Sequence, residues 1–469
     1  MARVIPPAAP LLILTWVGTL AHQFGGIAWA GTVAGLALAA FLLVELPRAS
    51  RAARLLFAGM TGAGLVALAF TPDPLGTLFE SWRRGASYVA FFLALSVLRD
   101  AAERSPLVRR CGRHLVAQPP GRRYAALAAG GHVYSIILSY GAIDLFGAMV
   151  TRANTLAAAG GSSEVQRIRL KRMMLAVYRG FAAMNCWSPL NIMTAVVSSA
   201  VPGARFGLLI PLAFGVAVVI LAAGWAVDRA SAARLATRGG TRPATEERWS
   251  IHMRIVALVL CVFAAAEIVG HVFHTSLVMG VTAAVPAFGI VWMVVQAARY
   301  GWLAALGTLP RRLRLFLRRL PSFRGEATVL GCGGFLAGAL AASLPVLGAS
   351  DLLTAAALPP LLVLFAIPTL VLVTGQLGLN PIVLIGAVGA AIPDPQAMGI
   401  APSVLAFACM LGWGIGANST PMSASAITTA RWAGASPWTI ATIWNGPLTL
   451  IALAIVWVAL LVAHLLMPA

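Results

Sequence analysis

Charged residues are scarce in this chain of 469 residues: Asp, Glu, Lys and Arg make up 10% of it, and only 14 residues are acidic. Hydrophobic residues make up 60%, and the mean hydropathy is +0.88. A soluble protein of this length could build a large core, but it could not hide so many apolar runs of about 17 residues or more. The composition predicts an all-α polytopic membrane protein whose helices contact the lipid bilayer.

Lysine is almost absent, because Lys171 is the one lysine among 34 basic residues, and the formal net charge is +20. Such a charge can indicate a nucleic-acid-binding protein, but these arginines lie in short loops between apolar spans. That distribution is the one expected for the cytoplasmic loops of a membrane protein. No nucleic-acid partner is therefore expected.

Cysteine and catalytic motifs are also sparse. The five cysteines form no CxxC pair, so neither a disulfide framework nor a metal site is predicted. The chain has no HExxH or GxSxG motif and no paired intramembrane His and Asp. A membrane-embedded enzyme is only a remote alternative, and no cofactor is expected beyond Na⁺ or H⁺ as a coupling ion.

What the sequence does contain is a polar motif that occurs twice inside apolar segments. The first copy includes Asn185, Pro189 and Asn191. The second includes Asn418 and Pro421, with the two leading asparagines 233 positions apart (418 minus 185). A continuous helix would bury these amides in hydrocarbon, which is costly. Broken helices at matching positions of two halves indicate the binding site of a secondary transporter.

The other apolar segments complete a set of about eleven transmembrane helices. Arginine clusters at 48–54, 99–123 and 229–254 predict cytoplasmic loops, which place the N-terminus in the cytoplasm and the C-terminus in the periplasm of a cell inner membrane. The basic stretch 311–319 predicts an interfacial helix. The predicted spans are 9–26, 28–46, 55–71, 85–98, 173–200, 205–227, 255–275, 277–297, 327–348, 399–430 and 437–465.

Two further apolar segments have flanks that do not fit a single crossing. Segment 124–154 is basic on both sides, so we expect a re-entrant hairpin that enters from the cytoplasm, with its tip at 139–144. Segment 357–393 has no Arg or Lys at its flanks and predicts a second re-entrant hairpin from the outer side. Span, hairpin and broken helix thus follow one another twice with opposite flank charge, which predicts an inverted-topology repeat.

This order divides the chain into four parts. The predicted parts are N-terminal scaffold helices at 1–84; a first repeat at 85–227, with hairpin 124–154 and broken helix 173–200; cytoplasmic loops and a connecting helix pair at 228–326; and a second repeat at 327–469, with hairpin 357–393 and broken helix 399–430.

The two hairpin tips and the two helix breaks are expected to converge at the membrane midplane. Half-helix N-termini there favour an anion, and freed carbonyls suit a cation such as Na⁺. The residues expected to bind the solute are Ser139, Tyr140, Gly141, Asn185, Ser188, Pro189, Asn191, Gln376, Asn380, Asn418, Ser419, Thr420, Pro421 and Ser423. The residues expected to bind the coupling ion are Asp144, Thr194, Gly375, Gly416 and Ser425. For any single residue, the alternative is a hydrogen bond that holds neighbouring helices together.

Asp144 is the one acidic residue at a hairpin tip, where ionisation is costly without a cation or a proton. We expect it to bind the coupling ion or proton, with a structural pair or a wetted position as the alternatives. Glu267, inside span 255–275, is the other candidate, although a structural or interface role is more common for such a residue. Gln376 and Asn380 suit a polar ligand but cannot titrate.

These residues resemble the ion transporter superfamily, and most closely the large membrane subunit of TRAP transporters. The likeness lies in 378–385, 411–416, Thr420-Pro421 and 433–434, and more loosely in 91–95 and 139–141. It implies cation-coupled uptake of a small, usually anionic, organic solute by an elevator-type motion. It also implies a small membrane subunit and a periplasmic solute-binding protein as partners. Scaffold helices in such proteins often carry a homodimer interface.

The chain departs from the family pattern at two sites, which leaves the solute open. The tip 139–144 lacks the Ser-Asn-Thr of dicarboxylate members, and Pro421 is followed by Met422 instead of a second Pro. The sequence thus predicts a secondary active transporter for a carboxylate-type organic anion, coupled to Na⁺ or H⁺. A Na⁺/H⁺ antiporter of the same architecture, which would depend on Asp144, is the alternative.

Overall fold

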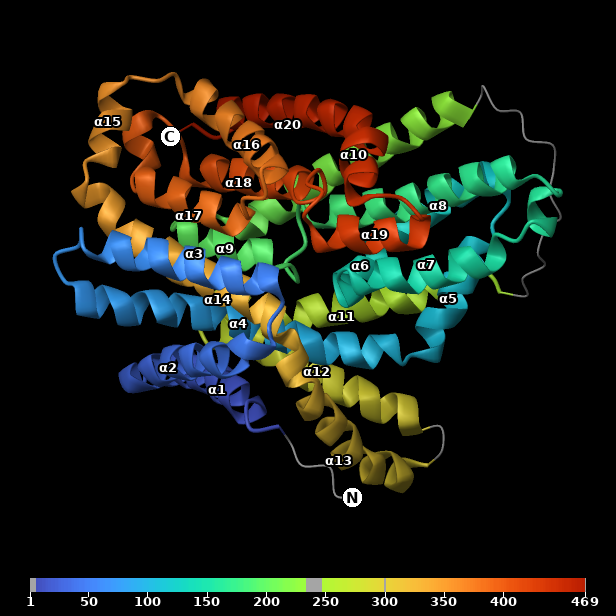
Figure 1. Ribbon diagram of the computed structural model, residues 1–469, viewed down its shortest axis with the longest axis horizontal. Helices are drawn as coiled ribbons and strands as arrows, with labels where there is room; N and C mark the ends of the chain where they lie inside the picture. The colour runs from blue at the N-terminus through green and yellow to red at the C-terminus, as the bar shows by residue number, and fades with distance from the viewer. Residues whose placement is uncertain (1–5, 233–246, 299–300, 469) are drawn as a thin grey trace.

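The computed structural model describes residues 6–232, 247–298 and 301–468, and these residues form helices and no strand (Figure 1). Residues 233–246 of the predicted cytoplasmic loop 229–254 lie outside the described part. The first ten α-helices are α1 (Ala9–Gly25), α2 (Ala28–Glu45), α3 (Arg51–Leu68), α4 (Pro74–Glu103), α5 (Pro106–Val116), α6 (Pro120–Leu138), α7 (Gly141–Ala153), α8 (Ser163–Met184), α9 (Ile192–Ala200) and α10 (Phe206–Ala232).

The remaining α-helices belong to the second half of the chain. They are α11 (Ser250–Val272), α12 (Leu277–Ala298), α13 (Trp302–Arg319), α14 (Arg324–Val346), α15 (Ala349–Ala355), α16 (Pro360–Gln376), α17 (Pro381–Ala391), α18 (Pro402–Gly416), α19 (Ala424–Ala433) and α20 (Gly446–Leu466). Short 3₁₀ turns are η1 (Leu46–Arg48), η2 (Ala157–Ala159), η3 (Leu320–Phe323) and η4 (Pro395–Met398), and η5 (Thr439–Trp444) is a π-helix.

Eight of the described helices or helix runs are long and apolar enough to cross a bilayer. The prediction of an all-α, multi-pass membrane protein is confirmed at this level. The other three predicted spans are α1, which has 17 residues, and the two broken helices α8–α9 and α18–α19. The total of eleven spans and the orientation of the termini stay predictions.

Helix α4 begins well before the predicted span 85–98. The Asp73 side chain accepts a hydrogen bond from the Gly76 N–H (3.0 Å), and Pro74 occupies the first turn, where its missing N–H costs nothing. The helix therefore starts at Pro74 and runs for 30 residues, about 45 Å at 1.5 Å per residue. As a consequence, Arg83 and Arg84 lie within the helix and not in a loop before it.

The chain forms both helical hairpins and both helix breaks at the residues where the sequence predicts them. Helices α6 and α7 meet at a two-residue turn in which Ser139 has a φ of 51°, a positive value that residues other than glycine rarely adopt. Helices α16 and α17 meet at 377–380, and the breaks lie at 185–191 and 417–423. Hereafter these are tip 1, tip 2, break 1 and break 2. Their depth in the membrane stays a prediction.

The order of helices from α4 to α10 is repeated from α14 to α20. In each run a long helix and a short helix precede a hairpin, a broken helix and another long helix. Some helix contacts are also repeated. Helix α6 packs on α8 in the first run, and α16 packs on α18 in the second. Between the runs, α7 packs on α19, and α17 packs on α9. The division of the chain into four parts and the inverted topology stay predictions.

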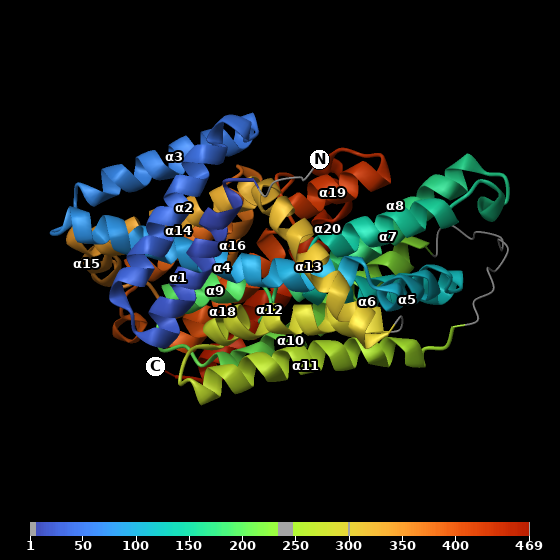
Figure 2. The same ribbon diagram turned by 90° about the horizontal axis from the view of Figure 1, so that it is seen from below.

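The helices pack as two groups. Helices α4 and α14 lie against each other and both contact α2 and α3. Helix α4 also contacts α12, and Figure 2 shows α4 between α14 and α12. We call α1–α4, α12 and α14 the α4 group. Helices α6, α8, α10, α16, α18 and α20 pack among themselves, and we call them the broken-helix group. The α9–α17 pair contacts α14 and α4 as well as α18 and α15, whereas the α7–α19 pair lies against α8 and α5 (Figure 1).

The two broken helices are in close contact at Gly414 of α18. A Cβ atom added there would lie 2.7 Å from the Cα of Cys186 in break 1 and would also overlap its Sγ atom. We expect Gly414→Ala to destabilise the protein by about 1–3 kcal/mol, because the contact involves backbone that cannot rotate away. Thermal unfolding in detergent measures this. Gly215→Ala on α10, which meets no atom within 4 Å, is the control and should unfold at or above the wild-type temperature.

Candidate functional site

Break 1 gathers four of the predicted polar residues. The Asn191 side chain caps α9 by accepting from the Met193 N–H (2.8 Å), and its amide donates to Asn185 Oδ1 (2.5 Å). Thr194 donates its hydroxyl to the Ser188 carbonyl (2.9 Å). Asn185, Ser188 and Thr194 are almost fully buried. The broken helix thus replaces its missing backbone bonds with side-chain bonds.

Break 2 is built in the same way. Ser425 donates its hydroxyl to Asn418 Oδ1 (2.9 Å), and Ser423 caps α19 by accepting from the Ala426 N–H (3.1 Å). Ser419 bonds to the Thr449 hydroxyl of α20 (3.0 Å), and Thr420 accepts from the Met422 N–H (3.2 Å). Pro421 follows Thr420 within the break, and all of these side chains come from the predicted set except Thr449.

Tip 2 lies directly on break 2. The Gln376 amide donates to the Ser419 carbonyl, and Gln376 Oε1 accepts from the Thr442 hydroxyl (3.2 Å). A Cβ atom added to Gly375 would lie 3.6 Å from the Thr420 Cβ. Gly416, at the end of α18, faces Val371 of α16 so closely that a Cβ atom would not fit. Asn380 caps α17 by accepting from the Ile382 N–H (3.0 Å).

The carbonyls that the breaks set free are occupied by protein donors. The Asn418 carbonyl accepts from the Tyr178 hydroxyl and from the Asn445 amide (3.5 Å). The Ser419 carbonyl accepts from Gln376, and the Ser188 carbonyl from Thr194. A carbonyl oxygen has two lone pairs, so a cation at the Ser188 or Ser419 carbonyl would share the oxygen with its protein donor.

Tip 1 lies apart from the polar network of break 2. The Tyr140 hydroxyl donates to Glu326 of α14 (2.6 Å), and the Arg99 guanidinium lies 4.4 Å from the centre of the Tyr140 ring. Gly141 also faces the Arg99 side chain, and Ser139 bonds within α6. This tip therefore packs against α4 and α14, which the sequence did not predict.

Asp144 lies in an ion pair with α19, and its role in binding the coupling ion stays a prediction. It lies in the first turn of α7, where its carboxylate pairs with Arg431 (2.6 Å) and accepts from the Trp432 indole (2.8 Å), both on α19. Arg431 therefore compensates the negative charge of Asp144, and the side chains of Asp144 and Arg431 are both partly exposed. This geometry fits two of the alternatives for Asp144, the structural pair and the wetted position.

Arg179 of α8 is a buried cation that sequence reasoning overlooked. Its guanidinium donates to Tyr124 (2.9 Å), the Asn445 side chain (3.1 Å) and the carbonyls of Gly224 (3.3 Å) and Trp444 (3.4 Å). All four acceptors are neutral, and Arg179 forms no ion pair with a carboxylate within residues 6–232, 247–298 and 301–468. An arginine inside the predicted span 173–200 was itself the signal, because ionisable residues within a span are rarely there by chance.

A cavity of about 640 Å³ opens beside break 1. Pro189 and Thr194 of the predicted set line it, together with Glu267 of α11 and the apolar side chains of Phe206 and Phe263. A smaller cavity of about 250 Å³ continues from Glu267 to His271 and His274. No cluster of three or more His, Cys, Asp or Glu that could hold a metal ion occurs within residues 6–232, 247–298 and 301–468.

Helices broken at polar residues and packed against helical hairpins are a feature of many membrane transporters. Among solved structures, the chain is similar to the YdaH transporter of Alcanivorax borkumensis, whose crystal structure reveals an unusual topology. The match covers 92% of this chain and 98% of that chain, with a TM-score of 0.54 and 17% sequence identity. At this identity the likeness shows the fold, which is that of a membrane transporter.

Neither a search of protein-family models nor a search of curated proteins finds a match to the sequence. The structural likeness supports a transporter fold without supporting the TRAP permeases in particular. The TRAP resemblance, with its solute-binding protein and small subunit, stays a prediction.

Proposed function

We propose that this protein is a secondary active transporter that moves a small organic anion across the membrane, coupled to Na⁺ or H⁺, by an elevator-type motion. The polar breaks and tips in otherwise apolar helices support a solute site. The N-terminal ends of α9 and α19, each capped at a break, favour an anionic group there. The uncompensated charge of Arg179 adds a positive potential next to break 2.

The observation that carries this proposal is an asymmetry between two halves that share one helix order. The α9–α17 pair packs along α14 and contacts α4 in addition to α18 and α15, while the α7–α19 pair lies against α8 and α5 and reaches α4 and α14 at tip 1. Because the two halves have equivalent helices, a second conformation is expected in which the α9–α17 pair and the α7–α19 pair exchange their packing positions. In that state α7–α19 would lie against the α4 group and α9–α17 would leave it. Such an exchange moves the solute site relative to the α4 group, which is alternating access.

The antiporter alternative depends on Asp144, and the ion pair with Arg431 gives that alternative no specific support. Na⁺ and H⁺ are therefore to be distinguished by experiment. A homodimer, a small membrane subunit and a periplasmic binding protein also stay predictions, and no observation described above depends on them.

A thermal-shift screen of the purified protein tests the proposal. We expect one class of organic anion to raise the unfolding temperature, and to raise it further with Na⁺ or at lower pH, because a ligand that binds the folded state stabilises it by about 2.7 kcal/mol at one hundred times its Kd. Neutral analogues of the same size are the control. Stabilisation that is the same for charged and neutral compounds and insensitive to Na⁺ and pH would contradict the proposal.

Gln376 offers a sharper test at the solute site. We expect Gln376→Ala to lower uptake of the stabilising anion by proteoliposomes at least about tenfold, because Gln376 joins tip 2 to break 2 and one such contact is worth about 1–2 kcal/mol. Gln296→Ala on α12, where the glutamine amide donates to the Ala101 carbonyl (3.1 Å), is the matched control. Equal uptake by the two variants would show that tip 2 is not part of the transport site.

A further inference from the structure

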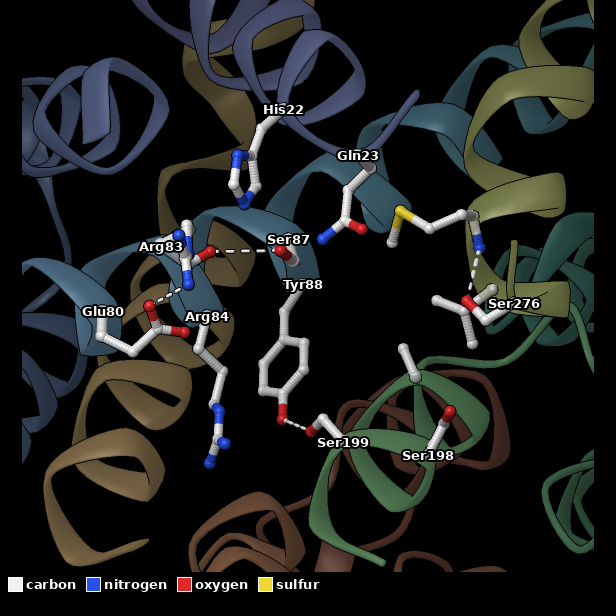
Figure 3. A pocket seen from close by; sticks show the side chains of 13 residues that line it. His22, Gln23, Glu80, Arg83, Arg84, Ser87, Tyr88, Ser198, Ser199 and Ser276 are labelled. Carbon is white, nitrogen blue, oxygen red and sulfur yellow. Dashed lines mark hydrogen bonds and ion pairs between the residues drawn. The ribbon is translucent and has the colours of Figure 1, made fainter. Parts of the chain in front are cut away.

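A second cavity, of about 260 Å³, lies between α1, α4, α9 and α12 (Figure 3). Its polar lining includes Arg83, Arg84 and Tyr88 of α4, with Ser198 and Ser199 of α9 facing them. Figure 3 shows Tyr88 reaching across to Ser199, and their hydroxyls are hydrogen-bonded. The cavity therefore lies where the α4 group meets a helix of the first repeat.

The charge in this cavity is positive. Two guanidinium groups and one carboxylate line it, and the carboxylate of Glu80 is paired with Arg83. Arg84 makes only one long hydrogen bond, to the Ala337 carbonyl (3.4 Å), and pairs with no carboxylate in the described part of the chain. Most of its five N–H donors are thus free to bind an anion. An arginine within a spanning helix is costly unless it faces water or a ligand.

The larger cavity beside break 1 adjoins this one. The two share Ser198, Ser276 and Val278 as lining residues. Beyond these residues the lining is mostly apolar and partly aromatic, with Phe206 and Phe263, and it also includes Glu267, which borders the smaller cavity with His271 and His274 as well. A basic cavity thus opens beside an apolar one, and both border α9.

We propose that these adjoining cavities form a docking site for an organic anion with an apolar body, in which Arg84 binds the anionic group and the aromatic cavity takes the rest. This inference rests on the proposed transport of organic anions and names the part of the molecule that first binds the solute. The basic cavity is smaller than the roughly 300–1,000 Å³ of drug-sized sites, so it suits a single charged group. An inorganic anion would leave the apolar cavity unused, and a neutral aromatic would leave Arg84 unpaired.

Equilibrium binding of three probes to the protein in lipid nanodiscs separates the contribution of the anionic group from that of the apolar body. Benzenesulfonate carries both a permanent anionic group and an aromatic body, methanesulfonate carries the charge alone, and benzyl alcohol carries the body alone. We expect benzenesulfonate to bind most tightly. Arg84→Gln should weaken it at least about tenfold, because a charge-assisted hydrogen bond is lost. Binding of benzyl alcohol should not respond to Arg84→Gln.

Arg54→Gln, at an exposed position of α3, removes the same positive charge as Arg84→Gln. It should leave the affinity for each of the three probes unchanged. Arg84→Lys should recover part of the lost affinity, because it retains the charge without the planar fork. No binding of benzenesulfonate to the wild type, or equal affinity in wild type and Arg84→Gln, would overturn the inference. Proteoliposome uptake is measured in parallel. This measurement distinguishes two results: a variant that loses the docking site but still transports, and a protein that binds the probe at Arg84 but does not transport.

Discussion

A disulfide between Gly333→Cys on α14 and Ile382→Cys on α17 should abolish transport and should restore it fully on reduction. A Cβ atom at Gly333 would lie 3.6 Å from the Ile382 Cβ, within the range of about 3.5–4.5 Å found in disulfides. Because α17 must leave α14 in the proposed exchange, a covalent bond between them holds the molecule in the described state. Uptake by proteoliposomes before and after oxidation measures the effect.

The experiment needs a background without native thiols, since Cys332 is adjacent to Gly333. The other cysteines to be replaced are Cys111, Cys186, Cys261 and Cys409. Each single cysteine variant should transport normally under oxidising conditions, which separates the crosslink from the substitutions. Undiminished uptake by a fully crosslinked sample would show that α14 and α17 stay together during transport, contrary to the proposed motion.

Arg179→Leu should have the second large effect, lowering both stability and transport. The guanidinium joins α8 to Tyr124 of α6, to the Gly224 carbonyl of α10 and to Asn445 beside α20, and the Asn445 amide in turn bonds to the Asn418 carbonyl of break 2. Without it several buried acceptors lose their donor, so we expect a loss of about 2–4 kcal/mol and a fall in uptake beyond tenfold. Thermal unfolding and proteoliposome uptake measure the two effects.

Arg179→Lys separates charge from geometry. A lysine keeps the charge but lacks the planar guanidinium that reaches all four acceptors. Arg179→Lys should therefore recover little of the lost stability and uptake. Arg54→Leu, at an exposed position of α3, is the control and should behave as the wild type. Wild-type stability and uptake in Arg179→Leu would show that this buried guanidinium is dispensable.

The helix breaks could be predicted from the sequence because their cause is local. Asn, Ser and Pro in an apolar segment cannot all be satisfied by a continuous helix, and the structure interrupts the helix at those residues. The hairpin 124–154 was predicted from its basic flanks, which also depend only on neighbouring residues. The structure shortens or extends these elements at their ends, as at α4, where the Asp73 cap moves the start by eleven residues (85 minus 74).

The environments of charged residues could not be predicted in the same way. The pairing of Asp144 with Arg431 joins positions 287 apart, so nothing near Asp144 in the sequence indicates it. Arg83 and Arg84 lie just before the predicted span 85–98, whereas the Asp73 cap starts the helix at Pro74 and places both within α4. Arg179 was visible within its span, but its neutral partners lie on α6, α10 and η5–α20 and are set by packing.

The most direct test of the proposed function is accumulation of the stabilising organic anion by proteoliposomes under an inward Na⁺ gradient, an inward H⁺ gradient, or neither. Cation-coupled transport predicts that one of the two gradients drives the anion above its external concentration, that an ionophore for that cation collapses the accumulation, and that the oxidised Gly333→Cys/Ile382→Cys protein shows none. Uptake that stops at the external concentration whichever gradient is imposed, or that persists in the crosslinked protein, would contradict it.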